Sequence, residues 1–150
     1  MNYKLIDAEI SNKSKLIEYK LKNILEYSEN LPSEEINKIK EYVNFNISNQ
    51  IEEYKIINIK NKNIGCVLVT KNEDGVLIDG IYIEQEYRNK GIGTDIIKNI
   101  LYNNSVVYLW VYKLNKKAIC LYKKLEFKII KETETRYYMR YRRSVWNYIK

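Results

Sequence analysis

Residues 87–101 read YRNKGIGTDIIKNIL, a loop with two of the chain's five glycines followed at once by an apolar-periodic segment. The helical spacing of its apolar residues predicts a helix with one buried side, formed by Ile92, Ile96, Ile97, Ile100 and Leu101. A loop that enters a helix presents unpaired backbone N–H groups, and glycine lets a ligand approach them. Arg88 and Lys90 add positive charge there. The loop alone fits two interpretations, a phosphate-binding site and a simple backbone turn.

The segments before this loop predict a strand and two helices. Residues 3–10 alternate like a strand, and residues 13–29 have helical spacing. A second helix is expected after Pro32, with Ser33 as its N-cap and two glutamates in its first turn. The residues expected to be buried on the two helices are Leu16, Ile17, Leu21, Ile24, Leu25, Ile36, Ile39, Val43 and Ile47.

An antiparallel meander is expected next, because the apolar residues take the spacing of strands from Tyr54 onward. Residues 54–60 and 64–71 flank a polar NKN and predict a hairpin, and the Asp74-Gly75 pair turns the second strand into residues 76–84. The loop and helix described above follow this third strand.

The rest of the chain predicts a crossover and a closing hairpin. The unbroken apolar run at residues 106–111 suits a strand buried on both faces, parallel to residues 76–83 across the intervening helix. A helix from about Asn115 and a hairpin around Glu134 complete a mixed sheet with helices on its faces. That helix is expected to bury Ala118, Leu121, Tyr122 and Leu125.

Composition favours one compact domain over residues 1–150, since 45% of the residues are hydrophobic and 30% are charged. No stretch approaches the roughly 20 apolar residues that span a bilayer, and the start lacks the features of a signal peptide, so a cytoplasmic protein is expected. The net charge of +7 is compatible with nucleic-acid binding. Lysine is abundant from end to end, however, so a nucleic-acid partner is not expected.

The chain contains no histidine and two cysteines, and this limits its chemistry. A Ser-His or Cys-His nucleophile pair and a His-ligated or Cys₄ zinc site are excluded, so no metal is expected. Cys66 and Cys120 both lie in apolar surroundings and are interpreted as reduced core thiols. Catalysis then depends on carboxylates, tyrosines, lysines or backbone dipoles.

Two motifs together resemble the GNAT superfamily of N-acetyltransferases. Residues 88–93 carry Arg-x-x-Gly-x-Gly, which is similar to that superfamily's coenzyme A loop. Residues 115–127 carry Asn-x-x-Ala-x-x-Leu-Tyr-x-x-Leu and a phenylalanine, which resembles a later segment of the same proteins. The resemblance implies an α/β (α+β) fold with a mixed, mostly antiparallel sheet of about seven strands. About four helices cover its faces, and a splayed parallel central pair holds the cofactor.

The resemblance also implies a site for acetyl-CoA. Backbone amides of the loop would hold the pyrophosphate, and the strand before it would bind the acetyl carbonyl and the pantetheine arm. The loop residues are Arg88, Asn89, Lys90, Gly91, Ile92, Gly93 and Thr94, and the strand residues are Ile81, Tyr82 and Ile83. Asn115 is expected to cap its helix and to hold the pantetheine arm, and Lys117 is a candidate partner of a cofactor phosphate.

Acetyl transfer to an ammonium needs a base and an acid. An amine with a pKa near 10.4 is mostly protonated at pH 7, a penalty of about 4.6 kcal/mol. Asp79 is our candidate base because it shares a strand face with Ile81 and Ile83, and Glu84 and Glu86 are the alternatives.

Tyr122 stands where the resemblance places the acid that protonates the leaving thiolate, although its apolar helix face equally suits core packing. The sequence departs from the pattern at Glu126, where many members have glycine, so a residue with a Cβ is expected in left-handed backbone. Trp110 replaces the acidic base of some protein N-terminal acetyltransferases, which favours Asp79.

The resemblance implies an acceptor that is an amine on a small molecule or on a protein. Acidic residues of the first two helices, among them Glu26, favour a small cationic amine, although solvated helix faces look the same. Tyr137 and Tyr138 are candidates for lining an acceptor pocket or for packing. The alternatives are a catalytically idle acetyl-CoA-binding sensor and a basic nucleic-acid-binding domain. A homodimer is the working expectation for the oligomeric state.

Overall fold

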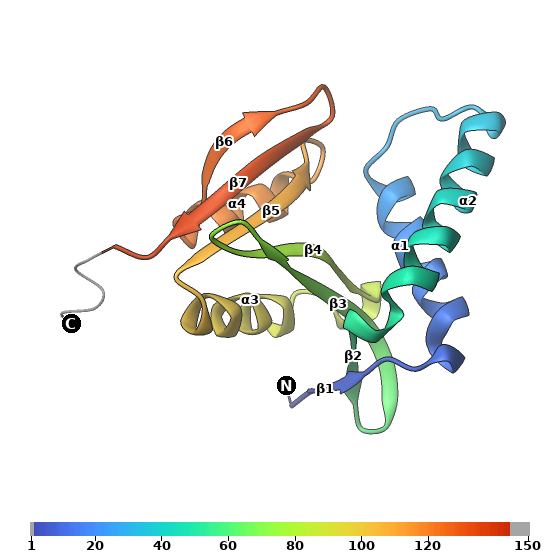
Figure 1. Ribbon diagram of the computed structural model, residues 1–150, viewed down its shortest axis with the longest axis horizontal. Helices are drawn as coiled ribbons and strands as arrows, with labels where there is room; N and C mark the ends of the chain where they lie inside the picture. Colours follow the sequence, from blue (N-terminus) through green and yellow to red (C-terminus); the bar gives the residue numbers. More distant parts are fainter. Residues whose placement is uncertain (1, 145–150) are drawn as a thin grey trace. The chain divides into compact units, whose positions relative to one another are not determined.

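A computed structural model describes residues 2–144, and its elements follow the predicted order (Figure 1). The strands are β1 (Lys4–Asp7), β2 (Tyr54–Ile59), β3 (Lys62–Asn72), β4 (Gly75–Ile83), β5 (Val106–Tyr112), β6 (Lys128–Glu132) and β7 (Arg136–Arg142). The α-helices are α1 (Lys13–Glu26), α2 (Ser33–Gln50), α3 (Ile92–Asn103) and α4 (Lys116–Lys124). Short 3₁₀ helices are η1 (Ile10–Asn12), η2 (Ile51–Glu53) and η3 (Gln85–Tyr87).

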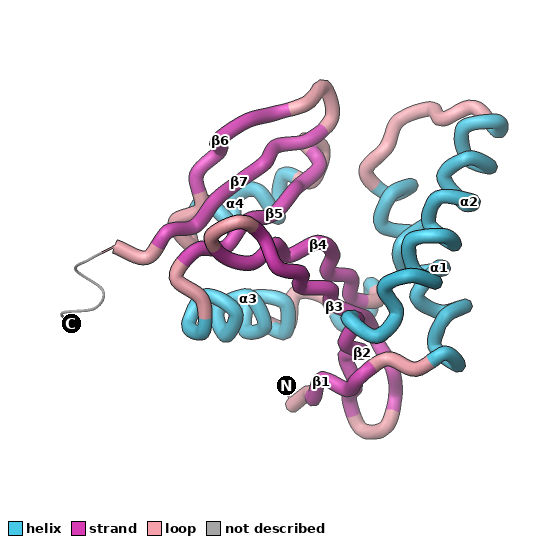
Figure 2. The backbone as a smooth tube through the Cα atoms, viewed as in Figure 1, coloured by secondary structure: helices cyan, strands magenta, loops and turns pink. Residues whose placement is uncertain are grey.

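The strands form a sheet in the order β1-β2-β3-β4-β5-β7-β6 (Figure 2). The pair β4–β5 is parallel, with Val76 opposite Val107 and Ile78 opposite Leu109, whereas β1–β2, β2–β3, β5–β7 and β6–β7 are antiparallel. The predicted fold class, a mixed and mostly antiparallel sheet with one parallel pair and four helices, is therefore confirmed.

The described chain forms two compact units, each made of two segments. Unit 1 comprises residues 2–69 and 80–92, and unit 2 comprises residues 70–79 and 93–144. The single domain over residues 1–150 stays a prediction.

The core of unit 1 lies between the helix pair and the strands β2 and β3. Leu16 and Tyr19 of α1 are fully buried, and Val43 and Ile47 of α2 are 1% exposed. Burying such side chains stabilises the fold by roughly 1.5 to 3 kcal/mol each. Tyr19 was not among the predicted core residues, and Leu25, which was, is 41% exposed.

The start of α2 differs from the prediction by one residue. Pro32 is the N-cap and Ser33 is the first helical residue, with no side-chain cap. Proline holds φ at −62°, and its carbonyl oxygen accepts the first helical hydrogen bond from the Ile36 N–H at 3.1 Å. Ser33 is therefore wrong as the N-cap, while Glu34 and Glu35 do lie in the first turn.

A two-residue turn joins β2 to β3. Lys60 and Asn61 both have positive φ, at 49° and 65°, as a hairpin turn of type I′ requires. The predicted hairpin is confirmed, with its turn one residue earlier than NKN. The Asn61 N–H donates to the side-chain oxygen of Asn58, a buried polar residue, at 3.1 Å.

Burial along β5 alternates, which corrects the prediction of a strand buried on both faces. Val107, Leu109 and Val111 are buried, whereas Tyr108 and Trp110 are only half-buried. β5 pairs with β7 over its full length, from Val106 to Tyr112, so its two faces are also the two faces of the β5–β7–β6 part of the sheet.

The end of α4 confirms the expected left-handed residue. Glu126 has φ of 73°. Its N–H donates to the carbonyl of Lys123 at 3.1 Å, and the Phe127 N–H donates to the carbonyl of Tyr122 at 3.0 Å. These two bonds define a Schellman motif, which normally carries glycine at this position.

The two cysteines lie in different surroundings. Cys66 is buried, as predicted, and burial raises the pKa of its thiol to about 12. Cys120 is exposed on α4, so its prediction as a core thiol is wrong. Its neighbour on the helix, Ile119, is buried instead. Within residues 2–144, no helix has the length and apolar character needed to cross a membrane.

Candidate functional site

The glycine loop enters α3 through two left-handed residues. Asn89 has φ of 63° and Gly91 has φ of 84°. An added Cβ at Gly91 would meet no atom within 4 Å, so glycine is required there by its backbone conformation and leaves the loop surface open. Ile92 is 2% exposed and anchors the first turn of α3. The loop therefore has the open backbone that an anion needs, at the start of a helix.

Arg88 does not point its charge into solvent. Its Nε donates to the carbonyl oxygen of Ile83 at 2.7 Å, and its Nη1 donates to Glu26 Oε2 at 3.0 Å. The guanidinium also lies over the ring of Tyr82, 5.2 Å from the centroid. Burial opposes the charge, but the hydrogen bond and the charge of Glu26 outweigh it and raise the pKa of Arg88. The side chain thus ties the loop to β4 and α1.

The N–H of Arg88 is also engaged, since it donates to the carbonyl of Gln85 at 3.2 Å. The loop residues that follow it are Asn89, Lys90, Gly91, Ile92, Gly93 and Thr94, of which Asn89, Lys90 and Gly91 are exposed. The amide of Arg88, one of the predicted pyrophosphate ligands, is therefore already hydrogen-bonded.

The end of β4 is held from α1 by a pair of stacked tyrosines. The rings of Tyr19 and Tyr82 have their centroids 5.1 Å apart. The Tyr19 hydroxyl donates to Glu84 Oε2 at 2.6 Å, the short distance typical of a hydroxyl bound to a carboxylate. Burial and the adjacent Glu84 both raise the pKa of Tyr19, so its hydroxyl stays protonated. Tyr19 therefore fixes the direction of the Glu84 carboxylate.

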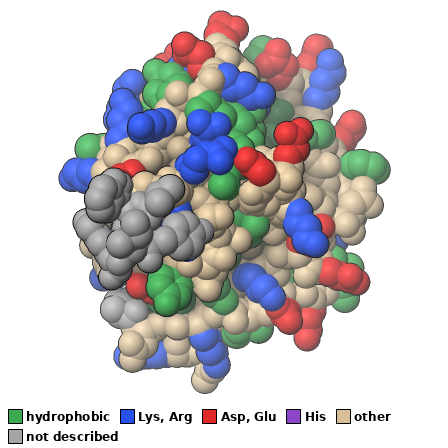
Figure 3. Space-filling view, turned by 60° about the vertical axis from the view of Figure 1, so that its left-hand side comes forward, with side chains coloured by type: hydrophobic (Ala, Val, Ile, Leu, Met, Phe, Trp, Pro, Cys, Tyr) green, Lys and Arg blue, Asp and Glu red, His purple; other side chains and the backbone are tan. Residues whose placement is uncertain are grey.

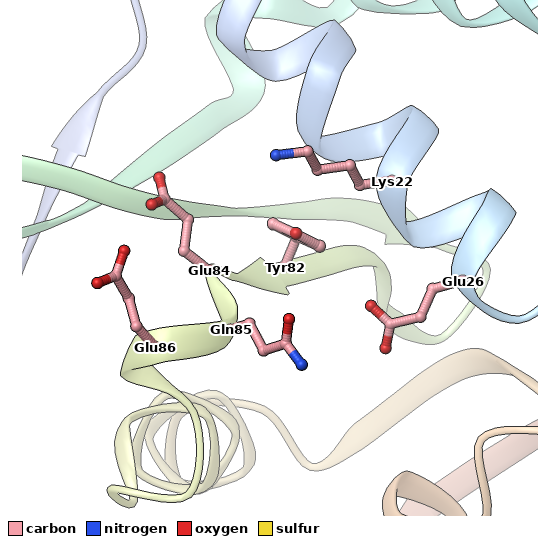
Figure 4. Close-up of a pocket in the computed structure, with 6 residues that line it drawn as sticks. All are labelled: Lys22, Glu26, Tyr82, Glu84, Gln85 and Glu86. Atoms are coloured by element: carbon pink, nitrogen blue, oxygen red, sulfur yellow. The ribbon is translucent and has the colours of Figure 1, made fainter.

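A pocket of about 660 Å³ opens beside these residues in unit 1 (Figure 4). Its lining consists of Lys22 and Glu26 from α1, Tyr82 from β4, and Glu84, Gln85 and Glu86 at and after the end of that strand. Three carboxylates thus surround a space of the size that small-molecule sites have. Lys22, the one cation of the lining, is paired with Glu18 at 2.9 Å.

The backbone of β4 directs alternate residues to opposite sides. The Tyr82 carbonyl lies against Gly65 of β3, where an added Cβ would come within 2.1 Å of its oxygen, and the Glu84 N–H donates to the Ile64 carbonyl at 2.8 Å. Because neighbouring residues of a strand turn their backbone groups to opposite sides, those of Ile81 and Ile83 face away from β3.

The remaining predicted residues lie in unit 2. Asp79 is half-buried on β4. Asn115 caps α4, its side-chain oxygen accepting from the Ala118 N–H at 3.2 Å, which confirms the predicted cap. Tyr122 is 8% exposed, and its ring packs 5.7 Å from that of Phe127, centroid to centroid. Lys117 is exposed in the first turn of α4.

The predicted site residues thus divide between the units, and unit 1 adds some that sequence reasoning missed. Tyr19, Lys22 and Gln85 were not predicted. Tyr19 follows the buried Leu16 by three residues, a spacing that would have placed it on the same helix face. Lys22 and Gln85 carry no comparable signal. No cluster of metal-ligating side chains occurs among residues 2–144.

A family model described as an acetyltransferase (GNAT) domain matches residues 51–129, more than half of the chain. No curated protein sequence matches. Many solved structures do, among them a PaiA N-acetyltransferase from Thermoplasma acidophilum in complex with coenzyme A, at 18% identity and a TM-score of 0.75. That match covers 95% of this chain and 99% of the other.

Two further structures have the same fold. PH1933 from Pyrococcus horikoshii OT3 is 18% identical with a TM-score of 0.73, and the match covers 96% of this chain and all of the other. The ribosomal-protein-S18-alanine N-acetyltransferase from Escherichia coli is 16% identical with a TM-score of 0.66, and 96% of each chain is covered. Identities this low show a common fold and leave the acceptor open.

Proposed function

The chain belongs to the GNAT acetyltransferase family and is an acetyl-CoA-dependent acyltransferase, and from this premise we propose that its acceptor is a small cationic amine. The acceptor nitrogen attacks the thioester carbonyl, so that a C–N bond forms and the C–S bond breaks. The amine loses a proton to a base, and the leaving thiolate gains one. The observation that carries the proposal is the carboxylate-lined pocket at the end of β4.

The pocket favours a cation for electrostatic reasons. Glu26, Glu84 and Glu86 line it. Arg88 is paired with Glu26, and Lys22 is paired with Glu18, so Glu84 and Glu86 supply the negative charge that no described cation of the pocket offsets. An ammonium group that enters the pocket exchanges its contacts with water for contacts with carboxylates, whereas an anion would be repelled by them. Glu84 is held at 2.6 Å by the Tyr19 hydroxyl, so one carboxylate has a fixed direction before the acceptor arrives.

The cofactor roles are assigned along the loop and β4. Backbone N–H groups from Asn89 to Thr94 would hold the pyrophosphate, and the N–H of Ile83 or Ile81 would meet the acetyl carbonyl. The orientation of β4 supports these two residues, because the backbone of Tyr82 faces β3. A backbone donor aimed at a developing oxyanion is worth about 3 kcal/mol. Asn115 and Lys117 remain candidate contacts to the pantetheine and to a phosphate.

The proton transfers are assigned to Asp79 and Tyr122. Asp79 accepts the proton of the amine, directly or through a water, and Tyr122 donates to the thiolate. The Tyr122 ring is packed against Phe127, which favours a single hydroxyl direction. We expect Tyr122→Phe to lower kcat about 100-fold with little change in the melting temperature, because the ring and its packing are kept.

Activity on an amine panel tests the acceptor class. Thiol release from acetyl-CoA is measured with mono-, di- and polyamines, with neutral amines and with amines that carry a carboxylate. We expect the multiply charged amines to react best, and Glu84→Gln to raise their KM about tenfold. Glu34→Gln, which removes the same charge in the first turn of α2, is the matched control. Binding of acetyl-CoA without turnover on any amine would instead support the idle sensor.

A second experiment tests the cofactor loop. Gly91→Asp and Gly91→Asn place side chains of nearly equal size at a left-handed position, so the backbone strain is similar in the two variants. Only aspartate adds a charge, so we expect acetyl-CoA to bind the Asp variant about 100-fold more weakly and the Asn variant within about tenfold of wild type. Equal affinities of the two variants would contradict a phosphate beside Gly91.

The cellular setting stays part of the proposal. We propose a cytoplasmic location and a homodimer. Size-exclusion chromatography with light scattering measures the oligomeric state, and a monomer at every accessible concentration would contradict the dimer.

A further inference from the structure

One face of unit 2 combines aromatic rings with cations in a regular pattern. Opposite residues in antiparallel strands share a face, and β5 and β7 pair Tyr108 with Arg140 and Trp110 with Tyr138. On the other side of β7, Lys131 of β6 lies opposite Tyr138. Together with Arg136 these residues form what we call the arginine–aromatic face: Tyr108, Trp110, Lys131, Arg136, Tyr138 and Arg140.

The rings of this face are in contact with one another. Tyr138 stacks with Tyr108 at 5.4 Å between centroids and lies 4.6 Å from Trp110. The amide of Asn72 donates to the Tyr138 hydroxyl at 2.9 Å, which holds the central ring in place. The rings are only half-buried, and the face is the side of β5 opposite the buried Val107 and Leu109.

Cations lie directly over these rings. The Arg136 guanidinium is 4.6 Å from the Trp110 centroid, and the Lys131 ammonium is 5.0 Å from that of Tyr138. Among residues 2–144, no carboxylate lies within salt-bridge distance of Lys131, Arg136 or Arg140. The positive charge of the face is therefore uncompensated.

One acidic group, Asp74, contacts a residue of the face. Asp74 accepts from the Tyr108 hydroxyl at 2.7 Å and from Arg142 at 3.3 Å, so its charge is already matched by that arginine. Figure 3 shows Lys and Arg side chains next to hydrophobic ones on the visible surface. Whole-chain lysine bias does not account for this arrangement, because three of the seven residues of β7 are arginines and all three alternate onto one face.

We propose that the arginine–aromatic face binds single-stranded nucleic acid, a function separate from acetyl transfer. Bases stack on aromatic rings and on guanidinium planes, and phosphates bind the uncompensated cations. A double helix hides the faces of its bases, so a half-open platform of rings favours single strands. From the sequence, no nucleic-acid partner was expected because lysine is spread evenly along the chain. The arginine–aromatic face instead gathers arginines and aromatic rings on one side of the sheet.

Fluorescence anisotropy with a labelled single strand of about 12 nucleotides, as RNA and as DNA, tests the proposal. We expect binding to both that weakens as salt rises from about 50 to 200 mM. The triple variant Lys131→Gln, Arg136→Gln, Arg140→Gln should lose at least about tenfold in affinity and show a shallower salt dependence. Tyr138→Leu should weaken binding several-fold with the salt dependence unchanged, because it removes stacking and no charge.

The matched control removes three cations from unit 1. Lys4, Lys60 and Lys62 line a second pocket, of about 840 Å³, and Lys4→Gln, Lys60→Gln, Lys62→Gln changes the net charge equally. This control should stay within about twofold of wild type. Thermal unfolding with and without acetyl-CoA verifies that each variant is folded.

Three results would overturn the proposal. The first is the absence of binding to either single strand, and the second is an equal loss in the two triple variants, which would indicate attraction by net charge alone. The third is a duplex or an inorganic polyphosphate that binds as tightly as the single strands, since neither offers bases for stacking.

Discussion

Both units place an arginine over an aromatic ring, but the two arginines differ in what else they contact. In unit 1, Arg88 lies over Tyr82 and also binds Glu26 and the Ile83 carbonyl. In unit 2, Arg136 lies over Trp110 without a carboxylate partner among the described residues. The same ring contact thus belongs to a closed network in one unit and to an open surface in the other.

This difference distinguishes cations that stabilise the fold from cations whose hydrogen-bond donors are available to a ligand. An arginine that satisfies a carbonyl and a carboxylate stabilises the loop it belongs to, and removing it leaves those groups without a partner. An arginine on an exposed ring adds roughly 0.5 to 1 kcal/mol and keeps its donors for solvent or a ligand. Counting charges in the sequence does not distinguish the two kinds.

The comparison is tested most directly by making the same substitution in each unit. Arg88→Gln should lower the free energy of unfolding by about 2 kcal/mol, because two hydrogen bonds and a ring contact are lost. Arg136→Gln should cost no more than about 1 kcal/mol. Urea unfolding at pH 7 measures both. Equal losses would mean that the two arginines are structurally equivalent.

Removing the Tyr19 hydroxyl sharpens the description of unit 1. Tyr19→Phe keeps the stacked ring but removes the hydrogen bond to Glu84, at a cost of about 1.5 kcal/mol. The KM for a cationic amine should rise several-fold with kcat nearly unchanged, because the carboxylate loses its fixed direction. A purely structural hydroxyl would change stability alone. The corresponding kinetic measurement on Tyr138→Phe in unit 2 should show no change.

Left-handed residues give a third comparison. In the described part of unit 1, four residues other than glycine have positive φ, and three of them are asparagines, namely Asn30, Asn61 and Asn89. In unit 2 the residue in this conformation is Glu126. Asparagine adopts this conformation at a lower energetic cost than glutamate, so Glu126→Gly should stabilise the protein by about 1 kcal/mol. Asn61→Gly is the control, with an expected change below about 0.5 kcal/mol. Thermal unfolding checks both, and destabilisation by Glu126→Gly would show that its side chain has a further role.

The smallest effect concerns acidity in unit 1. Burial opposes ionisation of Glu26, but hydrogen bonds from Arg88 and Tyr27 outweigh it and lower its pKa below the usual 4.5. Because the pKa is lower in the folded protein, the ionised carboxylate stabilises the fold fully at any pH above its ordinary pKa. This stabilisation is lost as the pH falls through the lowered pKa. The difference in melting temperature between wild type and Glu26→Gln should therefore be constant near neutral pH and shrink below about pH 4.5. A difference that grows on acidification would contradict this.

The sequence predicted the fold well because periodicity and turn residues are local. The helix after the glycine loop, the hairpins and the parallel pair all followed from spacing alone. The failures at Ser33 and Cys120 have local causes as well. Proline occupied the cap one residue earlier, and on α4 the residue next to Cys120, Ile119, is buried in its place. The burial of β5 was predicted wrongly because three residues on its less buried side are aromatic. In a sequence, an aromatic residue counts as apolar whether its ring is buried or only half-buried.

The site was predictable only where a motif lies in one continuous segment. The loop from Arg88 to Thr94 was identified as a candidate from its sequence, but the partners of Arg88 are a strand carbonyl and a glutamate 62 residues away. The bond from Tyr19 to Glu84 joins residues 65 apart. Such pairs depend on the tertiary fold, and no spacing rule in a single sequence reveals them.

Each unit carries one cysteine, and the two thiols differ in solvent exposure. Their rates of reaction with a thiol reagent therefore measure how often unit 1 unfolds. A thiol reagent should modify Cys120 within the mixing time, whereas Cys66, in the core of unit 1, should react only when that unit transiently unfolds. The slow phase of labelling then gives the opening frequency of unit 1, and the protection gained on adding an amine reports whether the ligand binds that unit.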